Sequence, residues 1–455
     1  MTTLASIERD LRAAVNADVI APTSAYLTDM TEARGLHGRA HAVALPRSAE
    51  EVAEVVAWCY ERGVPIVPRG GGTGYSGGSV PLEGGVVLAA ERLDRVRSFD
   101  PLLWRIEVEA GVTTANVRRV AREGGLLFAP DPGAAEQSQI GGNVATNAGG
   151  PHAYKYGVTG SWVTGIEAVV APGEIVRVGG PLRKDVASYD LTSLFVASEG
   201  TLGVITAVWL QLTPAPEAVW PVAGFFPTVA SGCAAIERLI GSGLPVAAIE
   251  YLDGETMRYA GAGFPSEIPP GAFCVITEAD GSPDEASRVR ADAVELLGED
   301  ALGLFAPESA QEITALWRWR DGVALRVDAQ QGGKASEDIA VPLDRIAEGI
   351  EESLAIGKRL GLDACSWGHA GDGNLHSTYL FSPGEPGAVE RAAQVSEELF
   401  ALAIRLGGTI SGEHGVGATK SHWLERQLGP KAYELHGAIK QAFDPRNLFN
   451  PGKKA

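Results

Sequence analysis

The feature that most constrains the fold of this chain is a glycine-rich stretch that runs from Arg69 to Ser79. It follows a strand-like run, 65–68, and contains Gly-x-Gly-x-x-Gly, a pattern that dinucleotide-binding folds place directly before a helix. Residues 80–85 contain a proline and two glycines, which disfavour a helix, and no Walker A Gly-Lys-Ser/Thr follows. We therefore expect a loop whose backbone N–H groups, with neighbouring hydroxyls, surround a pyrophosphate; a merely flexible turn is the alternative.

The chain has 455 residues, which exceeds what one hydrophobic core holds, so we expect more than one domain. A strand-like run ends in Thr213-Pro214-Ala215-Pro216, whose two prolines make it the best linker candidate. We divide the chain into an N-terminal helical segment (1–36), a first domain (37–215), a second domain (216–405) and a C-terminal segment (406–455).

Apolar spacing, capping residues and turn residues predict the main elements. Ser48 is expected to cap a helix that runs to Arg62 and is closed by Gly63. Beyond residue 216, strand and helix patterns alternate again. The other predicted elements are helices at 6–15, 114–123 and 431–443 and strands at 42–46, 65–68, 85–88 and 104–109.

The net charge of −19 argues against binding to nucleic acid or to an anionic membrane surface, because both repel an acidic protein. The first 19 residues carry acids and arginines and lack the apolar core of a signal peptide, and no later run reaches the length of a membrane span. We expect a cytoplasmic protein with no transmembrane segment. The absence of a Cys-x-x-Cys pair excludes an iron–sulphur or zinc-ribbon motif and indicates reduced thiols at Cys59, Cys233, Cys274 and Cys365.

Residues 368–376, Gly-His-Ala-Gly-Asp-Gly-Asn-Leu-His, predict a hairpin that brings two histidines together. Asp372-Gly373 is favoured in type I′ turns, and such a turn would place His369 opposite His376, with their Cβ atoms roughly 5 Å apart on one face. That separation suits chelation of a metal ion. Alternatively, histidines beside glycines are ordinary turn or core residues.

A second short segment, 411–415, supplies an acid and another histidine. Glu413 would complete a His/His/Glu set that suits zinc or another divalent transition metal and leaves a position open for a substrate. His414 would remain for proton transfer.

Five motifs occur in an order that resembles the FAD-binding domain of vanillyl-alcohol-oxidase type flavoenzymes. They are 68–74, Pro130-Asp131-Pro132-Gly133, 140–150, Tyr156-Gly157-Val158 and 198–206. Four later segments are similar to the branch that contains D-lactate dehydrogenase, D-2-hydroxyglutarate dehydrogenase and the flavin-carrying chain of glycolate oxidase. They are 336–342, 368–376, 411–415 and 449–453, so the resemblance extends from about residue 37 to the end.

The resemblance implies an α+β fold: a two-part FAD-binding domain of vanillyl-alcohol-oxidase type (37–215), an α+β substrate or cap domain with an antiparallel sheet (216–405), and a C-terminal segment (406–455) that packs back on the FAD site. It implies noncovalent FAD, because Thr73 stands where relatives with a covalent flavin often have a histidine. The residues implied to bind FAD are Pro68, Arg69, Gly70, Gly71, Gly72, Thr73, Gly74, Ser76, Gly77, Gly78, Ser79, Pro130, Asp131, Gly141, Gly142, Ala145, Thr146, Gly149, Gly150, Gly157, Val158, Glu199, Gly203, Ile205 and Asn450.

The resemblance also implies a divalent metal, for which we expect zinc, with manganese or iron as alternatives. Its implied ligands are His369, His376 and Glu413, and this agrees with the hairpin interpretation.

Arg320 and Lys334 occupy places where relatives keep contacts to the substrate carboxylate, which a planar guanidinium holds bidentately and an ammonium as a point charge. Arg318 is the register alternative to Arg320, and a solvated surface charge is the alternative for each.

The implied reaction is the FAD-dependent oxidation of a D-2-hydroxy acid, of the D-lactate, glycolate or D-2-hydroxyglutarate class, to the 2-oxo acid. The hydroxyl proton would go to His414 as the base, with metal assistance, and the hydride to flavin N5. Two alternatives stay open: an FAD-dependent oxidase of another alcohol, and a flavin-binding subunit of a multisubunit glycolate oxidase. The expected partners are the small substrate and an electron acceptor of unassigned identity, and a homodimer is left open.

Overall fold

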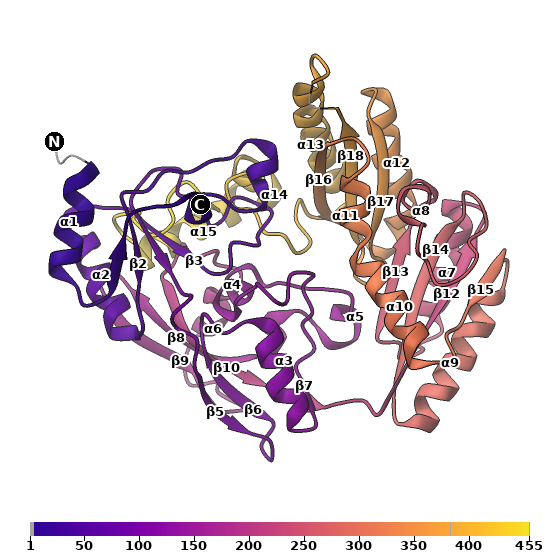
Figure 1. The fold of residues 1–455 in the computed structure, drawn as a ribbon, viewed down its shortest axis with the longest axis horizontal. Helices are drawn as coiled ribbons and strands as arrows, with labels where there is room; N and C mark the ends of the chain where they lie inside the picture. The colour runs from indigo at the N-terminus through magenta and orange to yellow at the C-terminus, as the bar shows by residue number, and fades with distance from the viewer. Residues whose placement is uncertain (1–3, 383, 455) are drawn as a thin grey trace. The chain divides into compact units, whose positions relative to one another are not determined.

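Two units make up the structure, a computed structural model that describes residues 4–382 and 384–454 (Figure 1). The chain passes between the units after residues 149, 156, 215 and 412. Unit 1 comprises 1–149, 157–215 and 413–455, and unit 2 comprises 150–156 and 216–412.

The first sheet of unit 1 positions the glycine-rich loop 70–79. Its strand order is β1-β2-β4-β3, with β4 parallel to β2 and β3, and β1 antiparallel to β2. Helix α2 (Ala49–Arg62) joins β2 to β3, the Ser48 hydroxyl accepts the Glu51 N–H at its start, and Gly63 ends it at a φ of 67°. The strands are β1 (Asp18–Ile20), β2 (Ala42–Leu45), β3 (Ile66–Arg69) and β4 (Val86–Ala89).

The second sheet of unit 1 is antiparallel, in the order β5-β6-β10-β8-β9. Strands β11 and β7 form a separate two-stranded sheet. The strands are β5 (Val96–Asp100), β6 (Arg105–Glu109), β7 (Leu126–Leu127), β8 (Val163–Val170), β9 (Glu174–Gly179), β10 (Val204–Gln211) and β11 (Thr213–Pro214).

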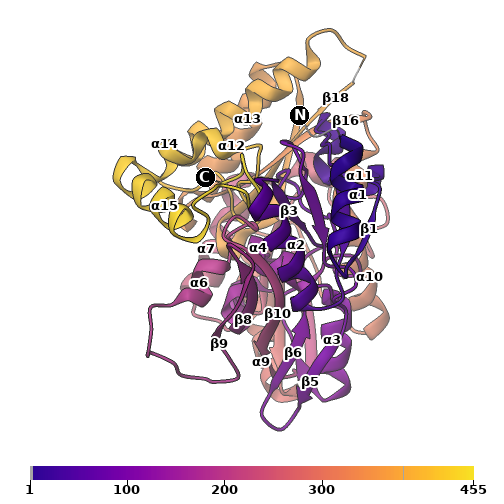
Figure 2. The same cartoon turned by 90° about the vertical axis from the view of Figure 1, so that its left-hand side faces the viewer.

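The C-terminal residues return to the first sheet of unit 1, where Phe449 bridges to Ile66 of β3. Helices α14 and α15 lie side by side in this segment (Figure 2). The helices of unit 1, besides α2, are α1 (Leu4–Ala14), α3 (Thr114–Glu123), α4 (Ile140–Thr146), α6 (Leu191–Phe195), α14 (Leu424–Leu428) and α15 (Pro430–Phe443).

Unit 2 is built on one antiparallel sheet with the order β15-β12-β14-β13-β17-β18-β16. Helices α7, α9, α12 and α13 pack against its strands and against one another. The strands are β12 (Ala218–Phe226), β13 (Ala248–Leu252), β14 (Phe273–Gly281), β15 (Gly303–Phe305), β16 (Gly333–Ala340), β17 (Asp363–His369) and β18 (Asn374–Phe381).

One face of this sheet packs on a second set of helices. Leu252, Cys274 and Trp367, which face one another across β13, β14 and β17, form a buried cluster with Leu316 and Trp319 of α10. The helices of unit 2 are α5 (Ala153–Tyr156), α7 (Val229–Gly241), α8 (Gly254–Ala260), α9 (Pro283–Gly298), α10 (Ala310–Asp321), α11 (Val323–Asp328), α12 (Ile346–Arg359) and α13 (Ala388–Arg405).

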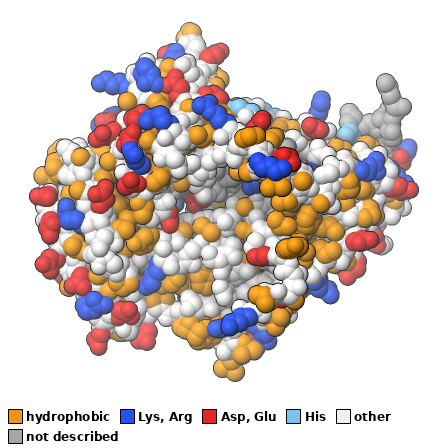
Figure 3. Space-filling model, turned by 180° about the vertical axis from the view of Figure 1, so that it is seen from behind, with side chains coloured by type: hydrophobic (Ala, Val, Ile, Leu, Met, Phe, Trp, Pro, Cys, Tyr) orange, Lys and Arg blue, Asp and Glu red, His pale blue; other side chains and the backbone are white. Residues whose placement is uncertain are grey.

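The predicted elements of the first 130 residues and the C-terminal helix are present within one or two residues of the expected bounds, and no helix begins within 70–85. The block 140–150, one of the five motifs, begins as helix α4. None of the helices in the described part of the chain combines the length and apolar character needed to cross a membrane. Acidic and basic side chains are interspersed over the described residues of the face in Figure 3.

Candidate functional site

A cavity lies in unit 1 among the two glycine blocks, and clefts of this kind are where proteins bind small molecules and cofactors. Most of the residues predicted to bind a cofactor line it. Those are Pro68, Arg69, Gly70, Gly71, Gly72, Thr73, Gly74, Ser76, Gly78, Ser79, Gly141, Gly142, Ala145, Thr146, Glu199, Gly203 and Ile205. Residues that were not predicted also line it: Leu88, Ala90, Ala110, Gln139, Asn143, Gly200 and Val204.

Close backbone approach explains the glycines of this wall. A Cβ atom on Gly71 would lie 2.1 Å from the carbonyl oxygen of Gln137, and one on Gly141 would lie 2.7 Å from the Cβ of Ala110. Gly72 has a φ of 68°, which disfavours any residue with a side chain. The loop therefore presents backbone to the cavity, as a site for a phosphate group requires.

Arg69 lines the cavity, but its guanidinium forms hydrogen bonds with the protein itself. It donates to the backbone carbonyls of Ala25 (2.6 Å) and Thr28 (2.8 Å) and to the Ser79 hydroxyl (3.1 Å). Burial lowers the pKa of this guanidinium, and the negative charge of Asp29 opposes that effect. Arg69 thus braces the start and end of the loop. The backbone N–H groups of the loop's glycines remain as the donors to an anion.

The C-terminus braces the same loop from another side. Asn450, at a φ of 46°, donates its side-chain amide to the carbonyls of Gly78 (2.8 Å) and Glu199 (2.7 Å). The Lys453 ammonium donates to the carbonyl of Val80 (2.6 Å), and burial lowers the pKa of Lys453 to about 8. Asn450 therefore acts on the cavity through the loop and is not among the cavity-lining residues.

His414 lies beside the glycine loop, within unit 1. Its ring stacks on the ring of Tyr75, with centroids 4.7 Å apart and planes 24° apart, and its carbonyl accepts the Ser76 hydroxyl at 3.1 Å. The next residues are fixed as well, because the N–H groups of Val416 (2.9 Å) and Gly417 (2.6 Å) donate to the Glu199 carboxylate. The segment that carries His414 is thereby attached to the cavity wall.

The predicted hairpin of unit 2 forms in a different register. His376 of β18 pairs with Trp367 of β17, and not with His369, because a 3₁₀ turn at Ala370–Asp372 lengthens the connection. His369 nevertheless lies on the same face as Trp367, two residues away, since side chains alternate along a strand. The two imidazoles therefore still meet, with ring centroids 5.3 Å apart and planes at 90°.

His369 is held by a buried carboxylate that sequence reasoning missed. Nδ1 of His369 lies 2.6 Å from Oε1 of Glu250, its cross-strand neighbour on β13, and Oε2 of Glu250 forms an ion pair with Arg320 of α10. Burial by itself would raise the pKa of Glu250, but His369 and Arg320 outweigh it and hold the pKa below its usual range. Arg320, predicted to contact a substrate carboxylate, is thus bound to Glu250.

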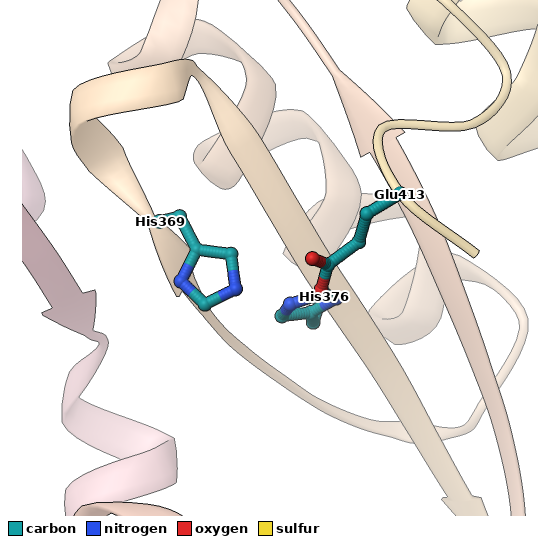
Figure 4. Close-up of side chains that lie close together, drawn as sticks. All are labelled: His369, His376 and Glu413. Carbon is teal, nitrogen blue, oxygen red and sulfur yellow. The ribbon is translucent and has the colours of Figure 1, made fainter. Parts of the chain in front are cut away.

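The metal-ligand candidates His369, His376 and Glu413 have their ligand atoms within 4.8 Å of one another. Figure 4 shows the two rings and the carboxylate directed toward a common space. Two imidazoles and a carboxylate are ligands that zinc and other divalent transition metals accept. The donor set therefore fits a divalent cation.

A second buried carboxylate, Asp338 of β16, fixes the turn that precedes Glu413. Its two oxygens accept the side-chain amide of Asn374 (2.6 Å) and the hydroxyl of Ser411 (2.9 Å). A Cβ atom on Gly412 would lie 2.2 Å from Nδ2 of Asn374, so only glycine fits there. Asp338, like Glu250, was not predicted.

The remaining predicted residues lie elsewhere. Lys334 of β16 forms an ion pair with Asp328 (2.5 Å), and Arg318, the register alternative, is exposed. Gly150 belongs to the short segment of unit 2. The predicted cofactor residues that do not line the cavity are Gly77, Pro130, Asp131, Gly149, Gly150, Gly157, Val158 and Asn450.

Comparisons with known proteins identify the family of the chain. Residues 40–179 match the family model described as "FAD binding domain", and residues 215–454 match "FAD linked oxidases, C-terminal domain". Glycolate oxidase subunit GlcD of Bacillus subtilis is 37% identical over 418 residues, which are 90% of this chain and 88% of that protein. D-lactate dehydrogenase of Archaeoglobus fulgidus is 34% identical over 444 residues, 96% of each chain.

Solved structures of low sequence identity share the fold. p-Cresol methylhydroxylase with substrate bound superposes with a TM-score of 0.81 at 18% identity, over 98% of this chain and 95% of that one. 4-Ethylphenol oxidase from Gulosibacter chungangensis gives a TM-score of 0.73 at 18% identity, over 98% and 93%. The expected α+β fold of vanillyl-alcohol-oxidase type is confirmed.

Proposed function

The chain belongs to the FAD-linked oxidases, and on that premise we propose that it oxidises a D-2-hydroxy acid to the 2-oxo acid. The observation that carries the proposal is the His369, His376 and Glu413 cluster, in a chain whose relatives are named glycolate oxidase subunit and D-lactate dehydrogenase. A 2-hydroxy acid bears a hydroxyl and a carboxylate on adjacent carbons, which a cation can bind together. An alcohol without an adjacent carboxylate would offer the cation only its hydroxyl.

The glycine-lined cavity of unit 1 supports FAD as the cofactor. When bound, FAD supplies the acceptor for the hydride that leaves C2 of the substrate. The loop at 70–79 would hold the pyrophosphate through backbone N–H groups, since Arg69, the residue directly before it, is committed to Ala25 and Thr28. Thr73, which lines the cavity, offers no side chain for a covalent flavin link, so we propose noncovalent FAD.

His369, His376 and Glu413 would hold the metal, zinc by preference. When bound, the metal lowers the pKa of the substrate hydroxyl and orients it. Glu250 orients the imidazole of His369, as carboxylates commonly do for metal-bound histidines. His414 follows Glu413 directly, so the proposed base and a proposed metal ligand are separated by one peptide bond.

His414 would take the hydroxyl proton of the substrate on its imidazole. The stack on Tyr75 fixes the plane of the ring, and the bond from Ser76 to its carbonyl fixes the backbone. Arg320 and Lys334 remain our proposals for the substrate carboxylate. In the structure each is paired with an acid, so substrate would share Arg320 with Glu250 and compete with Asp328 for Lys334.

The electrons must then pass to an acceptor, and a partner chain is one candidate. The Bacillus subtilis relative is named a subunit of glycolate oxidase, which favours a second candidate function, as the flavin-binding subunit of such a complex. The two candidates share the same half-reaction and differ only in how the reduced flavin is reoxidised.

Anaerobic reduction of the bound flavin tests the proposal. We expect D-lactate, glycolate or D-2-hydroxyglutarate to bleach the flavin absorbance, and pretreatment with a chelator to slow the bleaching until zinc is restored. L-lactate serves as the matched control for stereochemistry. A flavin that stays oxidised with every D-2-hydroxy acid, in metal-replete protein, would refute the proposed reaction.

A further inference from the structure

Glu250 is a fully buried acid in an apolar strand. It stands in Ala248-Ile249-Glu250-Tyr251-Leu252 of β13, and its side chain has no exposed surface. A buried carboxylate in such a place destabilises the fold unless it is paired and hydrogen-bonded. Its presence therefore calls for a role that an apolar side chain could not fill.

The two oxygens of Glu250 have different partners. Oε1 is hydrogen-bonded to Nδ1 of His369, and Oε2 accepts from Nη2 of Arg320. Arg320 is buried as well. When Nδ1 donates to Glu250, Nε2 is the ring nitrogen that carries the lone pair a metal needs. On Arg320, Nε is buried and finds no hydrogen-bond partner in the described part of the chain. The Nε–H group of Arg320 is therefore left as a donor for one more acceptor.

We propose that Glu250 is a positioning residue that fixes His369 and Arg320 relative to each other. One carboxylate selects the Nδ1–H tautomer of His369 and sets the place of the Arg320 guanidinium, so neither can shift without the other. This inference rests on the proposed function, in which His369 binds the metal and Arg320 the substrate carboxylate. Because a 2-hydroxy acid carries its hydroxyl and carboxylate on adjacent carbons, a fixed spacing of His369 and Arg320 assigns to Glu250 a part in selecting such acids.

Glu250→Gln separates this role from simple packing, because the amide keeps the size of the side chain. Its carbonyl oxygen will turn to the permanent cation Arg320, which leaves the NH₂ group facing Nδ1 of His369. The ring must then accept at Nδ1 and carry its proton on Nε2, the nitrogen that the metal needs. Long-range ¹⁵N NMR of histidine-labelled, metal-free, FAD-loaded protein reads this tautomer directly. His369→Gln assigns the signal among the eight histidines.

Glu278→Gln is the matched control. Glu278 lies on β14 of the same sheet, is nearly buried, and also pairs with a histidine, since its Oε1 is 2.8 Å from Nε2 of His152. That histidine is not a proposed metal ligand. Glu278→Gln should change the His152 signal and leave the His369 signal and the zinc affinity as in the wild type.

We expect Nδ1–H for His369 in the wild type and Nε2–H in Glu250→Gln. Zinc affinity, measured by competition with a chromophoric chelator, should fall about 10–100-fold in that variant. The KM for D-lactate should rise, and thermal unfolding of Glu250→Gln and Glu278→Gln should show whether folding is equally affected.

An unchanged His369 tautomer in Glu250→Gln overturns the inference, as does a zinc affinity that His369→Gln removes and Glu250→Gln leaves unaltered. If the wild type takes up no zinc at all, the metal part of the proposed function fails. The tautomer comparison in metal-free protein then still decides the role of Glu250.

Discussion

The carboxylate of Glu199 accepts the backbone N–H of Val416 at 2.9 Å, although the two residues are 217 positions apart in the sequence. Glu199 lines the glycine-rich cavity, and Val416 lies two residues after His414. On the other side of Glu413, the Ser411 hydroxyl donates to Asp338. The short segment that carries a proposed metal ligand and the proposed base is therefore anchored at both ends by buried carboxylates.

Glu199→Gln should loosen the anchor at the cavity wall. The carboxylate accepts two backbone N–H groups, of Val416 and Gly417, whereas an amide has one carbonyl oxygen and would turn its NH₂ group toward the other donor. We expect weaker FAD binding, by about tenfold for a loss of roughly 1.4 kcal/mol. Fluorescence titration of the apoprotein with FAD measures it. Glu174→Gln, at an exposed position of β9, is the control and should bind FAD like the wild type.

His414→Ala should retain FAD and lose turnover. General-base catalysis contributes about 10²–10⁴-fold, so stopped-flow reduction of the flavin by substrate should slow by that factor. Tyr75→Phe keeps the ring that stacks on His414 and removes only the hydroxyl, so we expect a rate close to the wild type. If flavin in His414→Ala were reduced at the wild-type rate, His414 would be eliminated as the base.

Local signals in the sequence predicted local structure well. The Ser48 cap and the Gly63 stop bracket α2, and each depends only on hydrogen bonds within a few residues of the helix end. The meeting of His369 and His376 was also predicted, but through the wrong register, because a 3₁₀ turn replaces the expected two-residue turn. The two histidines still meet because the register differs from the predicted one by two residues, which is the period of a strand, so both side chains stay on the same face.

The supports of the site could not be predicted in the same way. Glu250 is a single acid in an apolar strand, and its partners His369 and Arg320 are 119 and 70 residues away in the sequence. Nothing near Glu250 in the sequence distinguishes it from an acid at a strand edge. Arg320 itself was predicted for substrate, yet its ion pair with Glu250 depends on how α10 packs across the sheet, which periodicity does not specify.

Asp338→Asn should weaken metal binding without touching a proposed ligand. Asp338 accepts from both Asn374 and Ser411, and an asparagine there would face one donor with its own NH₂ group, at a cost of about 1–3 kcal/mol. We expect a lower Tm and a smaller rise of Tm on addition of zinc. Differential scanning calorimetry with and without zinc measures both. A zinc-induced rise equal to that of the wild type would show that the turn before Glu413 does not depend on Asp338.

Asp253 should make unit 2 less stable as the pH rises. Burial raises its pKa from 3.8 to about 6, although its side chain also accepts the Thr256 N–H at the start of α8. The folded state therefore holds the proton more tightly than the unfolded state, so the stability from this group is present below about pH 4 and is lost as the pH rises through about 6. The full effect is of the order of 3 kcal/mol. Asp253→Asn keeps an N-cap side chain and cannot ionise. The Tm of the variant should exceed that of the wild type at pH 8 and approach it near pH 4, and a Tm difference independent of pH would contradict the raised pKa.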